Sequence, residues 1–195
     1  MLKVGITGGI GAGKSVVCSI LNKWGIPVFY ADTEARNLMH HNSSVKEAII
    51  HEFGGKIYNE SGILQKNILS DIIFNDEQSR LKINSIVHPF VRETFIEWSK
   101  KQSSPYVVEE AAILFESGAD SLMDQTVVVY SDKEIRIKRI QNRNQFSRSK
   151  IENIISHQMS EEEKCKKADY IIYNNEKALL VPQLIKLHNI FKNNS

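Results

Sequence analysis

Short apolar runs alternate along the chain with stretches of helical periodicity. The runs are LKVGIT (2–7), PVFYA (27–31), PYVVEEA (105–111), QTVVVY (125–130) and ADYIIY (168–173). Nearly continuous β-branched and aromatic runs are typical of strands buried on both faces of a sheet, and each parallel connection needs a crossover, usually a helix. The pattern therefore predicts an α/β fold with a five-stranded, mainly parallel sheet.

The region between the second and third runs has helical periodicity instead. Its apolar positions at helical spacing include Val87, Val91, Phe95 and Trp98. A polar stretch with glycines, FGGKIYNESG, interrupts the region at residues 53–62 and is typical of a loop. We expect residues 32–103 to form a helical insertion, long enough for a lobe, within a core built from residues 1–31 and 104–195.

The composition makes several classes of protein poor candidates. Of the 195 residues, 42% are hydrophobic and 25% are charged, which is ordinary for a globular protein. No apolar run approaches the ~18 residues that a membrane-spanning helix needs, and the N-terminal apolar stretch runs into glycines without a cleavage site. A net charge of +2 gives no bulk electrostatic reason to bind nucleic acid, and Cys18 and Cys165 lack the spacing of a disulfide framework or a zinc site. We expect a cytoplasmic protein without nucleic-acid or membrane partners.

The stretch VGITGGIGAGKSVV, residues 4–17, carries the clearest chemistry. Its segment from Gly8 to Ser15 fits the G-x-x-x-x-G-K-[ST] pattern of a phosphate-binding loop, between a predicted strand and an amphipathic stretch. The glycines let backbone N–H groups turn toward an anion, Lys14 can reach the outer phosphates, and Ser15 can hold Mg²⁺. The plain alternative is a tight glycine turn. A dinucleotide-binding loop would need glycine where Lys14 stands, so we expect a nucleoside triphosphate.

Carboxylates follow two of the predicted strands. Asp32 comes just past the second strand, which we expect beside the strand that leads into the phosphate loop, and there it could accept the proton of an attacking hydroxyl. It could equally be the N-cap of the next helix. After the third strand come Glu109, Glu110 and Glu116, of which one could hold Mg²⁺ through water or serve only a structural role. Strand alternation puts Glu109 and Glu110 on opposite faces of the sheet, so we expect only one of them to meet the site.

A basic segment follows the fourth strand. Residues 133–150 contain seven Lys or Arg and one acid, Glu134. Arg136, Arg139 and Arg143 share one helical face, from which guanidinium groups could neutralise the charge of a transferring phosphate on a mobile arm. A solvated basic face is the alternative.

Within the insertion, His88 and Arg92 stand four residues apart. This spacing predicts that they share a helical face opposite the apolar stripe. Pro89 suits the first turn of a helix, so we expect a helix to begin close to it. A surface or packing role for His88 is the alternative.

Several stretches, taken in order, resemble the dephospho-coenzyme A kinase family over nearly the whole chain. They are GITGGIGAGKS, YADTEAR, FGGKIYNESGILQKNIL, IIFND, INSIVHPFV, ILFESG, RIKRIQNRN, HQMSEEEK and ADYIIYN. The resemblance implies a P-loop kinase-type three-layer fold with a nucleotide-binding core, a helical domain for the coenzyme A precursor, and a lid at residues 142–166. It also implies ATP-dependent phosphorylation of the ribose 3′-hydroxyl of dephospho-coenzyme A, giving coenzyme A and ADP.

The resemblance further implies roles for residues at matching positions. Asp32 would be the catalytic base, while Lys14, Arg139 and Arg143 would act on the transferring phosphate. Ser15 would hold Mg²⁺. Independently of the resemblance, the position of Glu110 at a strand end makes it a candidate for a further ligand through water, and the choice among Glu109, Glu110 and Glu116 stays open. The residues implied for ATP are Gly9, Gly11, Ala12, Gly13, Lys14, Ser15, Val16 and Asn174. Those implied for the acceptor are Thr7, Asp32, His88 and Arg92.

Two other functions stay open at this point. One is another P-loop kinase, acting on a nucleoside or nucleotide, and the other is a nucleotide-dependent switch that hydrolyses ATP without a phosphorylated acceptor. Asp32 and the basic segment favour transfer to an acceptor, but the residues alone do not identify the product.

Overall fold

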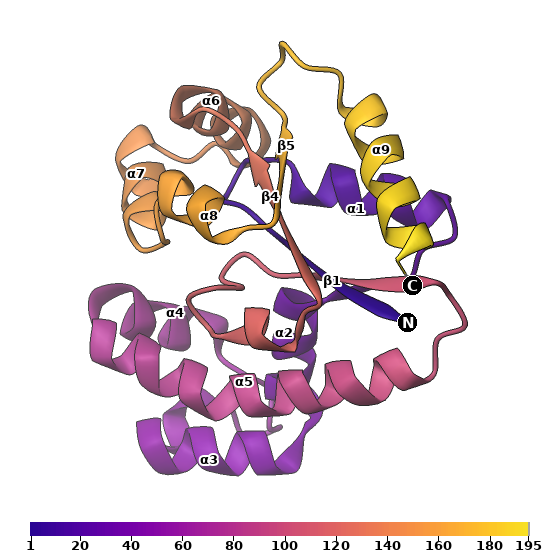
Figure 1. The fold of residues 1–195 in the computed structure, drawn as a ribbon. Coiled ribbons are helices and arrows are strands. Elements are labelled where there is room, and N and C mark those ends of the chain that lie inside the picture. Colours follow the sequence, from indigo (N-terminus) through magenta and orange to yellow (C-terminus); the bar gives the residue numbers. More distant parts are fainter. Residues whose placement is uncertain (195) are drawn as a thin grey trace. The chain divides into compact units, whose positions relative to one another are not determined.

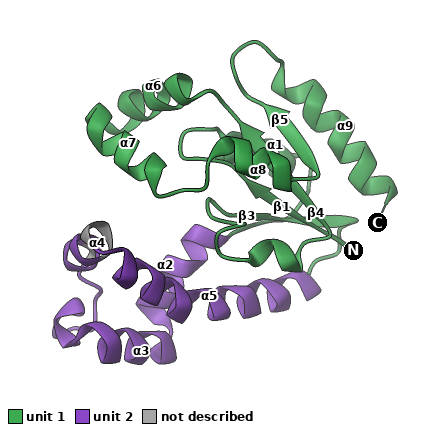
Figure 2. Cartoon of the chain, turned by 60° about the vertical axis from the view of Figure 1, so that its left-hand side comes forward, with its two compact units in different colours: residues 1–30, 101–195 green, residues 31–100 purple. Residues whose placement is uncertain are grey.

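A computed structural model describes residues 1–194 of the chain, except for the side chains of residues 66 and 73–75. The chain divides into two compact units, drawn in green and purple in Figure 2. The first unit consists of residues 1–30 and 101–195, and the second of residues 31–100. These bounds fall slightly before the expected ones, because Ala31 is already the first residue of a helix and the last helix of the second unit ends at Lys100.

The first unit is built on a parallel sheet. Its strands in the described residues are β1 (Leu2–Thr7), β2 (Val28–Tyr30), β3 (Tyr106–Glu110), β4 (Gln125–Tyr130) and β5 (Tyr170–Tyr173). They lie in the order β2-β3-β1-β4-β5, and every neighbouring pair is parallel. This confirms the predicted α/β fold with a five-stranded sheet.

The expectation that β2 lies beside β1 is wrong. Strand β1 pairs with β3 on one side and with β4 on the other, so both of its edges are occupied. The three-residue strand β2 therefore joins the sheet at its edge, through β3 alone. Strand β3, which follows residues 31–100 along the chain, takes the place between β1 and β2. Consecutive strands are often neighbours in a sheet, but they need not be.

Two helices cover one face of the sheet, α1 (Lys14–Lys23) and α9 (Leu180–Asn193), as Figure 1 shows. Alternate strand residues point toward them, since successive side chains of a strand face opposite sides. The buried strand residues of this cluster are Val4, Ile6, Tyr106, Val108, Val127, Val129 and Ile172. On the opposite face Gly5 makes room for Leu114, because a Cβ at Gly5 would lie 2.7 Å from Leu114 Cδ2.

The basic segment after β4 and the residues that follow it are helical. They form α6 (Lys133–Asn144), α7 (Arg148–Ser156) and α8 (Glu161–Lys167), drawn from brown to orange in Figure 1. Helices α6 and α7 share a small apolar cluster of Ile137, Ile140 and Ile151. A capping box of Ser160 and Glu163 starts α8, which fixes where this helix begins. A short 3₁₀ helix, η2 (Ala119–Leu122), precedes β4.

The second unit is helical in its described residues. It contains α2 (Ala31–His41), α3 (Ser43–Phe53), the 3₁₀ helix η1 (Gly55–Ile57), α4 (Lys66–Asn75) and α5 (Glu77–Lys100). Helix α5 packs against α2, α3 and α4. Its buried face repeats every fourth residue through Ile83, Val87, Val91, Phe95 and Ser99, whereas Trp98 is half-buried and stacks on Phe95. The stretch at 53–62 holds η1 and a bridge between Tyr58 and Leu64.

The expectation that a helix begins near Pro89 is wrong, because Pro89 lies inside α5. The true start is set by Asp76, whose carboxylate accepts hydrogen bonds from the N–H groups of Gln78 and Ser79. The Ser79 hydroxyl also donates to this carboxylate, and its bond together with the two backbone bonds lowers the pKa of Asp76, as expected for a capping carboxylate. The apolar stripe then continues past Pro89, so burial along α5 outweighs the missing N–H.

Candidate active site

The phosphate loop, residues 8–15, leaves β1 at the carboxyl end of the parallel sheet. Gly8, Gly11 and Gly13 have positive φ values of 146°, 81° and 100°, which disfavour any residue with a Cβ. A Cβ at Gly8 would also lie 2.4 Å from the carbonyl oxygen of Val129. Gly13 directly precedes α1, so the first N–H groups of that helix have no intrahelical acceptor and can bind an anion.

Lys14 opens α1 and reaches back over the loop. Its Nζ donates a hydrogen bond of 2.8 Å to the carbonyl oxygen of Gly8 and lies 3.8 Å from Oε1 of Glu110. Lys14 is 9% exposed, whereas Ser15 and Val16 in the same turn are exposed. The turn therefore presents the ammonium group of Lys14, fixed by a hydrogen bond, and the accessible hydroxyl of Ser15. These are the groups expected at a site for a triphosphate with a metal ion.

The three glutamates after β3 have different surroundings. Glu110 is the one near Lys14, at 13% side-chain exposure, and Glu109 is buried at the preceding strand position, which faces the other side of the sheet. Glu116 instead accepts a hydrogen bond from the N–H of Met159 at 2.8 Å and pairs with the fully buried Lys164 at 3.1 Å. Glu116 therefore anchors α8, and Glu110 is the carboxylate placed at the phosphate loop.

Thr7, at the end of β1, is fully buried. Its hydroxyl donates a long hydrogen bond of 3.4 Å to the carbonyl oxygen of Ala112, which also accepts a bond of 2.9 Å from Lys164 Nζ. Thr7 thus has a partner within the core, and its assignment to the acceptor remains a prediction.

Arg139 and Asn174 meet above the phosphate loop, whereas Arg143 lies apart. Arg139 donates to the Ser131 hydroxyl at 3.3 Å and to the Asn174 carbonyl at 3.0 Å. The Asn174 side chain donates to the carbonyl oxygen of Ala12 in the loop at 2.8 Å. Arg143 is exposed, and its Nε donates to Asn144 within α6. The structure therefore brings Arg139 and Asn174 together and does not bring Arg143 to them.

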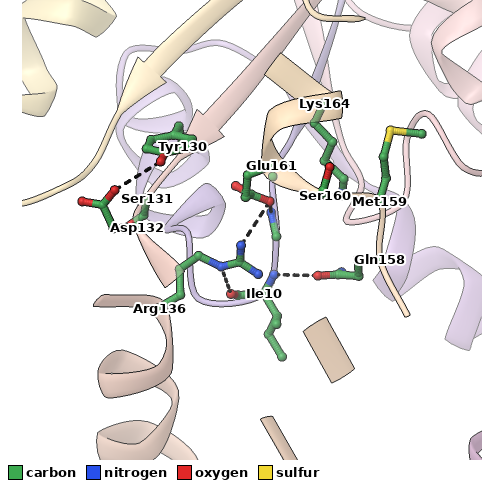
Figure 3. A network of polar contacts seen from close by, with 12 residues as sticks. Ile10, Tyr130, Ser131, Asp132, Arg136, Gln158, Met159, Ser160, Glu161 and Lys164 are labelled. Carbon is green, nitrogen blue, oxygen red and sulfur yellow. Dashed lines mark hydrogen bonds and ion pairs between the residues drawn. The ribbon is translucent and has the colours of Figure 1, made fainter. Parts of the chain in front are cut away.

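Three further residues contact the loop. Sequence analysis assigned no role to Gln158 or Glu161, and it grouped Arg136 with the guanidinium groups that could neutralise a transferring phosphate, not with residues that hold the loop. Gln158 and Glu161 accept hydrogen bonds from the N–H groups of Ile10 and Gly9, and Arg136 donates to the Ile10 carbonyl (Figure 3). Arg136 lies on the same face of α6 as Arg139, which was the available signal. Nothing in the spacing shows that one guanidinium is buried and the other is partly exposed.

In the second unit, Asp32 and Arg92 both lie within electrostatic range of His88. Burial lowers the pKa of His88, the Arg92 cation lowers it further, and the Asp32 carboxylate acts in the opposite direction. The three residues are partly buried, and helices α2 and α5, which carry them, pack against each other. Helices α2 and α5 bring an acid, an imidazole and a guanidinium together, a set that can bind a polar substrate.

The capping alternative for Asp32 is wrong. Helix α2 begins at Ala31, one residue earlier, so Asp32 lies within the first turn instead of preceding the helix. A carboxylate in the first turn is favoured by the helix dipole.

The two cysteines are free thiols, with Cys18 buried and Cys165 half-buried. Burial raises the pKa of Cys18, and so does the nearby Glu110 carboxylate, which keeps this thiol protonated. Cys18 therefore packs in the core as a small apolar residue. Among the described residues, no helix combines the length and the apolar composition needed to cross a membrane.

Comparison with known proteins identifies the family. The dephospho-CoA kinase family model matches residues 2–179. A dephospho-CoA kinase of Bacteroides fragilis is 36% identical over 187 residues, covering 95% of this chain and 91% of the relative. One from Fusobacterium nucleatum is 38% identical over 172 residues, covering 88% of this chain and 89% of that protein.

Solved structures agree in fold. A dephospho-CoA kinase from Campylobacter jejuni is 28% identical with a TM-score of 0.70, covering 99% of this chain and 98% of that chain. The protein TT1252 from Thermus thermophilus is 28% identical with a TM-score of 0.84, covering 97% of this chain and 96% of that chain. A shikimate kinase from Bacteroides thetaiotaomicron shares the fold alone, at 14% identity and a TM-score of 0.54, covering 98% of each chain. The chain therefore belongs to the dephospho-CoA kinase family.

Proposed function

We propose that this protein transfers the γ-phosphoryl group of ATP to the ribose 3′-hydroxyl of dephospho-coenzyme A, giving coenzyme A and ADP as the last step of coenzyme A biosynthesis. The family match over residues 2–179 carries the proposal. The phosphate loop supports it, because glycine backbone, Lys14 and the start of α1 form an anion-binding concavity.

The phosphate loop holds the triphosphate. Of the residues from Gly11 to Val16, Gly11, Gly13 and Ser15 would direct N–H groups to the phosphates, while the N–H groups of Ala12 and Val16 donate to the carbonyls of Gly9 and Gly13. Lys14 would shift from the Gly8 carbonyl to the outer phosphate oxygens. Phosphoryl transfer depends mainly on positioning the reactants and on neutralising the negative charge of the transferring phosphate. The central requirement is therefore a cation fixed close to the loop, which is Lys14 in this proposal.

Mg²⁺ fits the residues at the start of α1. Ser15 would offer its exposed hydroxyl, and Glu110 would act through water from its place beside Lys14. When bound, the ion neutralises phosphate charge. The chain's own contribution is the oxygen donor set and the rigid turn that carries it.

Asp32 is the general base in this proposal. It accepts the proton of the 3′-hydroxyl as the phosphoryl group is transferred. This role is supported by its place in the first turn of α2, in a polar cluster with His88. His88 and Arg92 bind the acceptor, with Thr7 as the predicted contribution from the core, and residues 31–100 form the acceptor-binding unit.

The basic segment completes the proposal. Residues 142–166 form the lid, Arg139 and Arg143 act on the transferring phosphate, and Asn174 contacts the nucleotide base. Arg139 is supported by its contacts with Ser131 and Asn174, which hold its guanidinium in place. Arg143 would have to leave Asn144 to take part.

We assign the protein to the cytoplasm, with small molecules as its partners. Two free cysteines suit a reducing compartment. Immunodetection in cell fractions tests this assignment, since recovery in a secreted or periplasmic fraction contradicts it.

Product identification tests the function most directly. The protein is incubated with Mg-ATP and a panel of acceptors, namely dephospho-coenzyme A, nucleosides, nucleotides and shikimate, and each phosphorylated product is identified by mass. We expect coenzyme A as the main product. Phosphorylation of a nucleoside while dephospho-coenzyme A stays inert would contradict the proposal, as would ATP hydrolysis without any phosphorylated acceptor.

A further inference from the structure

We propose that Arg136 and Glu161 are positioning residues of the phosphate loop: they hold the backbone of Gly9 and Ile10 in the conformation in which the loop binds nucleotide phosphates. The inference rests on the proposed function only in assuming that the loop binds a nucleotide. It goes beyond that function because neither residue is needed to contact substrate.

Arg136 reaches the loop from α6 and Glu161 reaches it from α8, as Figure 3 shows. Arg136 Nε donates to the carbonyl oxygen of Ile10 at 2.9 Å, and Glu161 Oε1 accepts from the N–H of Gly9 at 2.9 Å. The same Glu161 oxygen lies 3.3 Å from an Arg136 Nη atom, so the pair closes a ring with the backbone. Gln158 adds a fourth contact by accepting from the N–H of Ile10 at 3.0 Å.

These contacts fix successive peptide groups of the loop. The peptide before Gly9 has its carbonyl bonded to Lys14 Nζ and its N–H to Glu161. The next peptide has its carbonyl bonded to the N–H of Ala12 and its N–H to Gln158. The Ile10 carbonyl is bonded to Arg136. The N–H groups of Ala12 and Val16 donate to the carbonyls of Gly9 and Gly13. With these groups satisfied, the N–H groups of Gly11, Gly13 and Ser15 are the ones left to face the anion.

The two side chains are buried and charged, and burying a charge costs free energy unless it is paired and hydrogen-bonded. Arg136 is 3% exposed and Glu161 is 8% exposed. Burial lowers the pKa of Arg136, while the carboxylates of Glu161 and Glu162 act in the opposite direction. Removing one partner would leave the other charge buried without compensation, so each residue depends on the other.

The close approach explains why the loop has glycine at position 9. A Cβ there would lie 2.3 Å from an Arg136 Nη atom and 2.6 Å from Glu161 Oε1. The guanidinium and the carboxylate therefore occupy the space that a side chain would take. The backbone of Gly9 is held from one side by this pair, and a loop held in one conformation binds its ligand with a smaller ordering cost.

Arg136 thus differs from Arg139, its neighbour on the same helix. Arg136 has its Nε and an Nη group engaged by Ile10 and Glu161, so it acts through the loop. Arg139 is only partly buried and contacts Ser131 and Asn174, so it can reach a bound nucleotide.

The test compares Arg136→Ala and Glu161→Ala with exposed charged residues of the same two helices, Lys138→Ala on α6 and Lys167→Ala on α8. The Kd of Mg-ATP is measured by calorimetry, the KM values of ATP and dephospho-coenzyme A by steady-state kinetics, and folding by thermal melting. Loss of a charge-assisted hydrogen bond predicts that the Kd and KM of ATP rise about tenfold in the first pair. The KM of dephospho-coenzyme A should stay within about twofold, and both controls should match the unsubstituted protein within the same limit.

A purely structural role would lower the melting temperature and the active fraction while leaving the Kd of ATP unchanged in the folded protein. That result overturns the proposal, and so does an equal rise of the Kd in the two controls, which would indicate a general charge effect. If the alanine variants do not fold, Arg136→Lys and Glu161→Gln decide instead, because both retain most of the packing volume. These should raise the Kd of ATP by about threefold to tenfold, and an unchanged value in them contradicts the proposal.

The direct binding measurement separates this inference from the proposed function. Should the protein fail to phosphorylate dephospho-coenzyme A but still show a weaker Kd of ATP in the Arg136 and Glu161 variants, the positioning role stands and the proposed reaction is wrong.

Discussion

The phosphate loop and the helical unit of residues 31–100 present polar groups in different ways. In the loop, eight consecutive residues set the direction of the backbone groups, and a single side chain, Lys14, supplies the charge. In the helical unit, Asp32 comes from α2, whereas His88 and Arg92 come from α5, and only the packing of these helices brings them together. Recognition by backbone is specified locally, whereas recognition by side chains depends on tertiary packing.

The difference predicts that each region controls a separate step. Changes in the loop should weaken ATP binding, because the proposed function places the phosphates there. Changes at Asp32 should affect turnover without weakening ATP binding, because the proposed function gives this residue a role on the acceptor.

The largest effect is expected for Asp32→Asn. The substitution keeps the shape of the side chain but removes its ability to accept a proton, so kcat should fall by about 10²- to 10⁴-fold. The Kd of Mg-ATP should stay close to that of the unsubstituted protein. Coupled ADP release and calorimetry measure the two quantities. Turnover near normal in this variant would remove Asp32 from the catalytic step and leave it only a role in α2.

A smaller loss of turnover, with weaker ATP binding, is expected for Lys14→Ala. Removing the ammonium group takes away both the bond to Gly8 and the charge beside Glu110, so kcat should fall by about 10²- to 10³-fold and the Kd of ATP should rise. The same two assays apply, with Lys23→Ala at the other end of α1 as the control. Unchanged ATP affinity would show that Lys14 does not contact the phosphates.

The smallest effect concerns the pH dependence of stability at His88. Its pKa is lowered in the folded protein, so the unfolded chain binds more protons between that value and the ordinary pKa of about 6.5. The free energy of unfolding should therefore fall as the pH drops below about 6.5, and His88→Gln should weaken this dependence. Urea unfolding between pH 7.5 and 5 measures this dependence of the free energy of unfolding on pH. An identical pH dependence in both proteins would contradict the cause assigned to the shift, and His157→Gln, at an exposed position, is the control.

Much of the fold could be predicted from the sequence. Strands β1 and β4 have the predicted bounds, and β3 and β5 are only trimmed at their ends, because buried parallel strands require nearly continuous apolar runs. The order of the strands could not be predicted in full: the position of β3 between β1 and β2 depends on pairing across residues 31–100, and local periodicity has no information on it. The start of α5 was missed for a related reason, since capping by Asp76 and a long buried stripe outweighed the signal from Pro89.

Some features of the candidate site could be predicted from the sequence, and others depend on the fold. The sequence by itself determined the phosphate loop, the family and the alternating strands, since each depends on residues that are consecutive or regularly spaced. Only the tertiary structure decided that Glu110 lies at Lys14 while Glu116 pairs with Lys164, and that Arg136 is buried against Gly9 and Ile10. The physical reason is that a buried charge is defined by its partners, and these partners come from segments distant along the chain. A motif can therefore identify the loop that binds an anion, but the side chains that hold this loop in place become visible only in the folded protein.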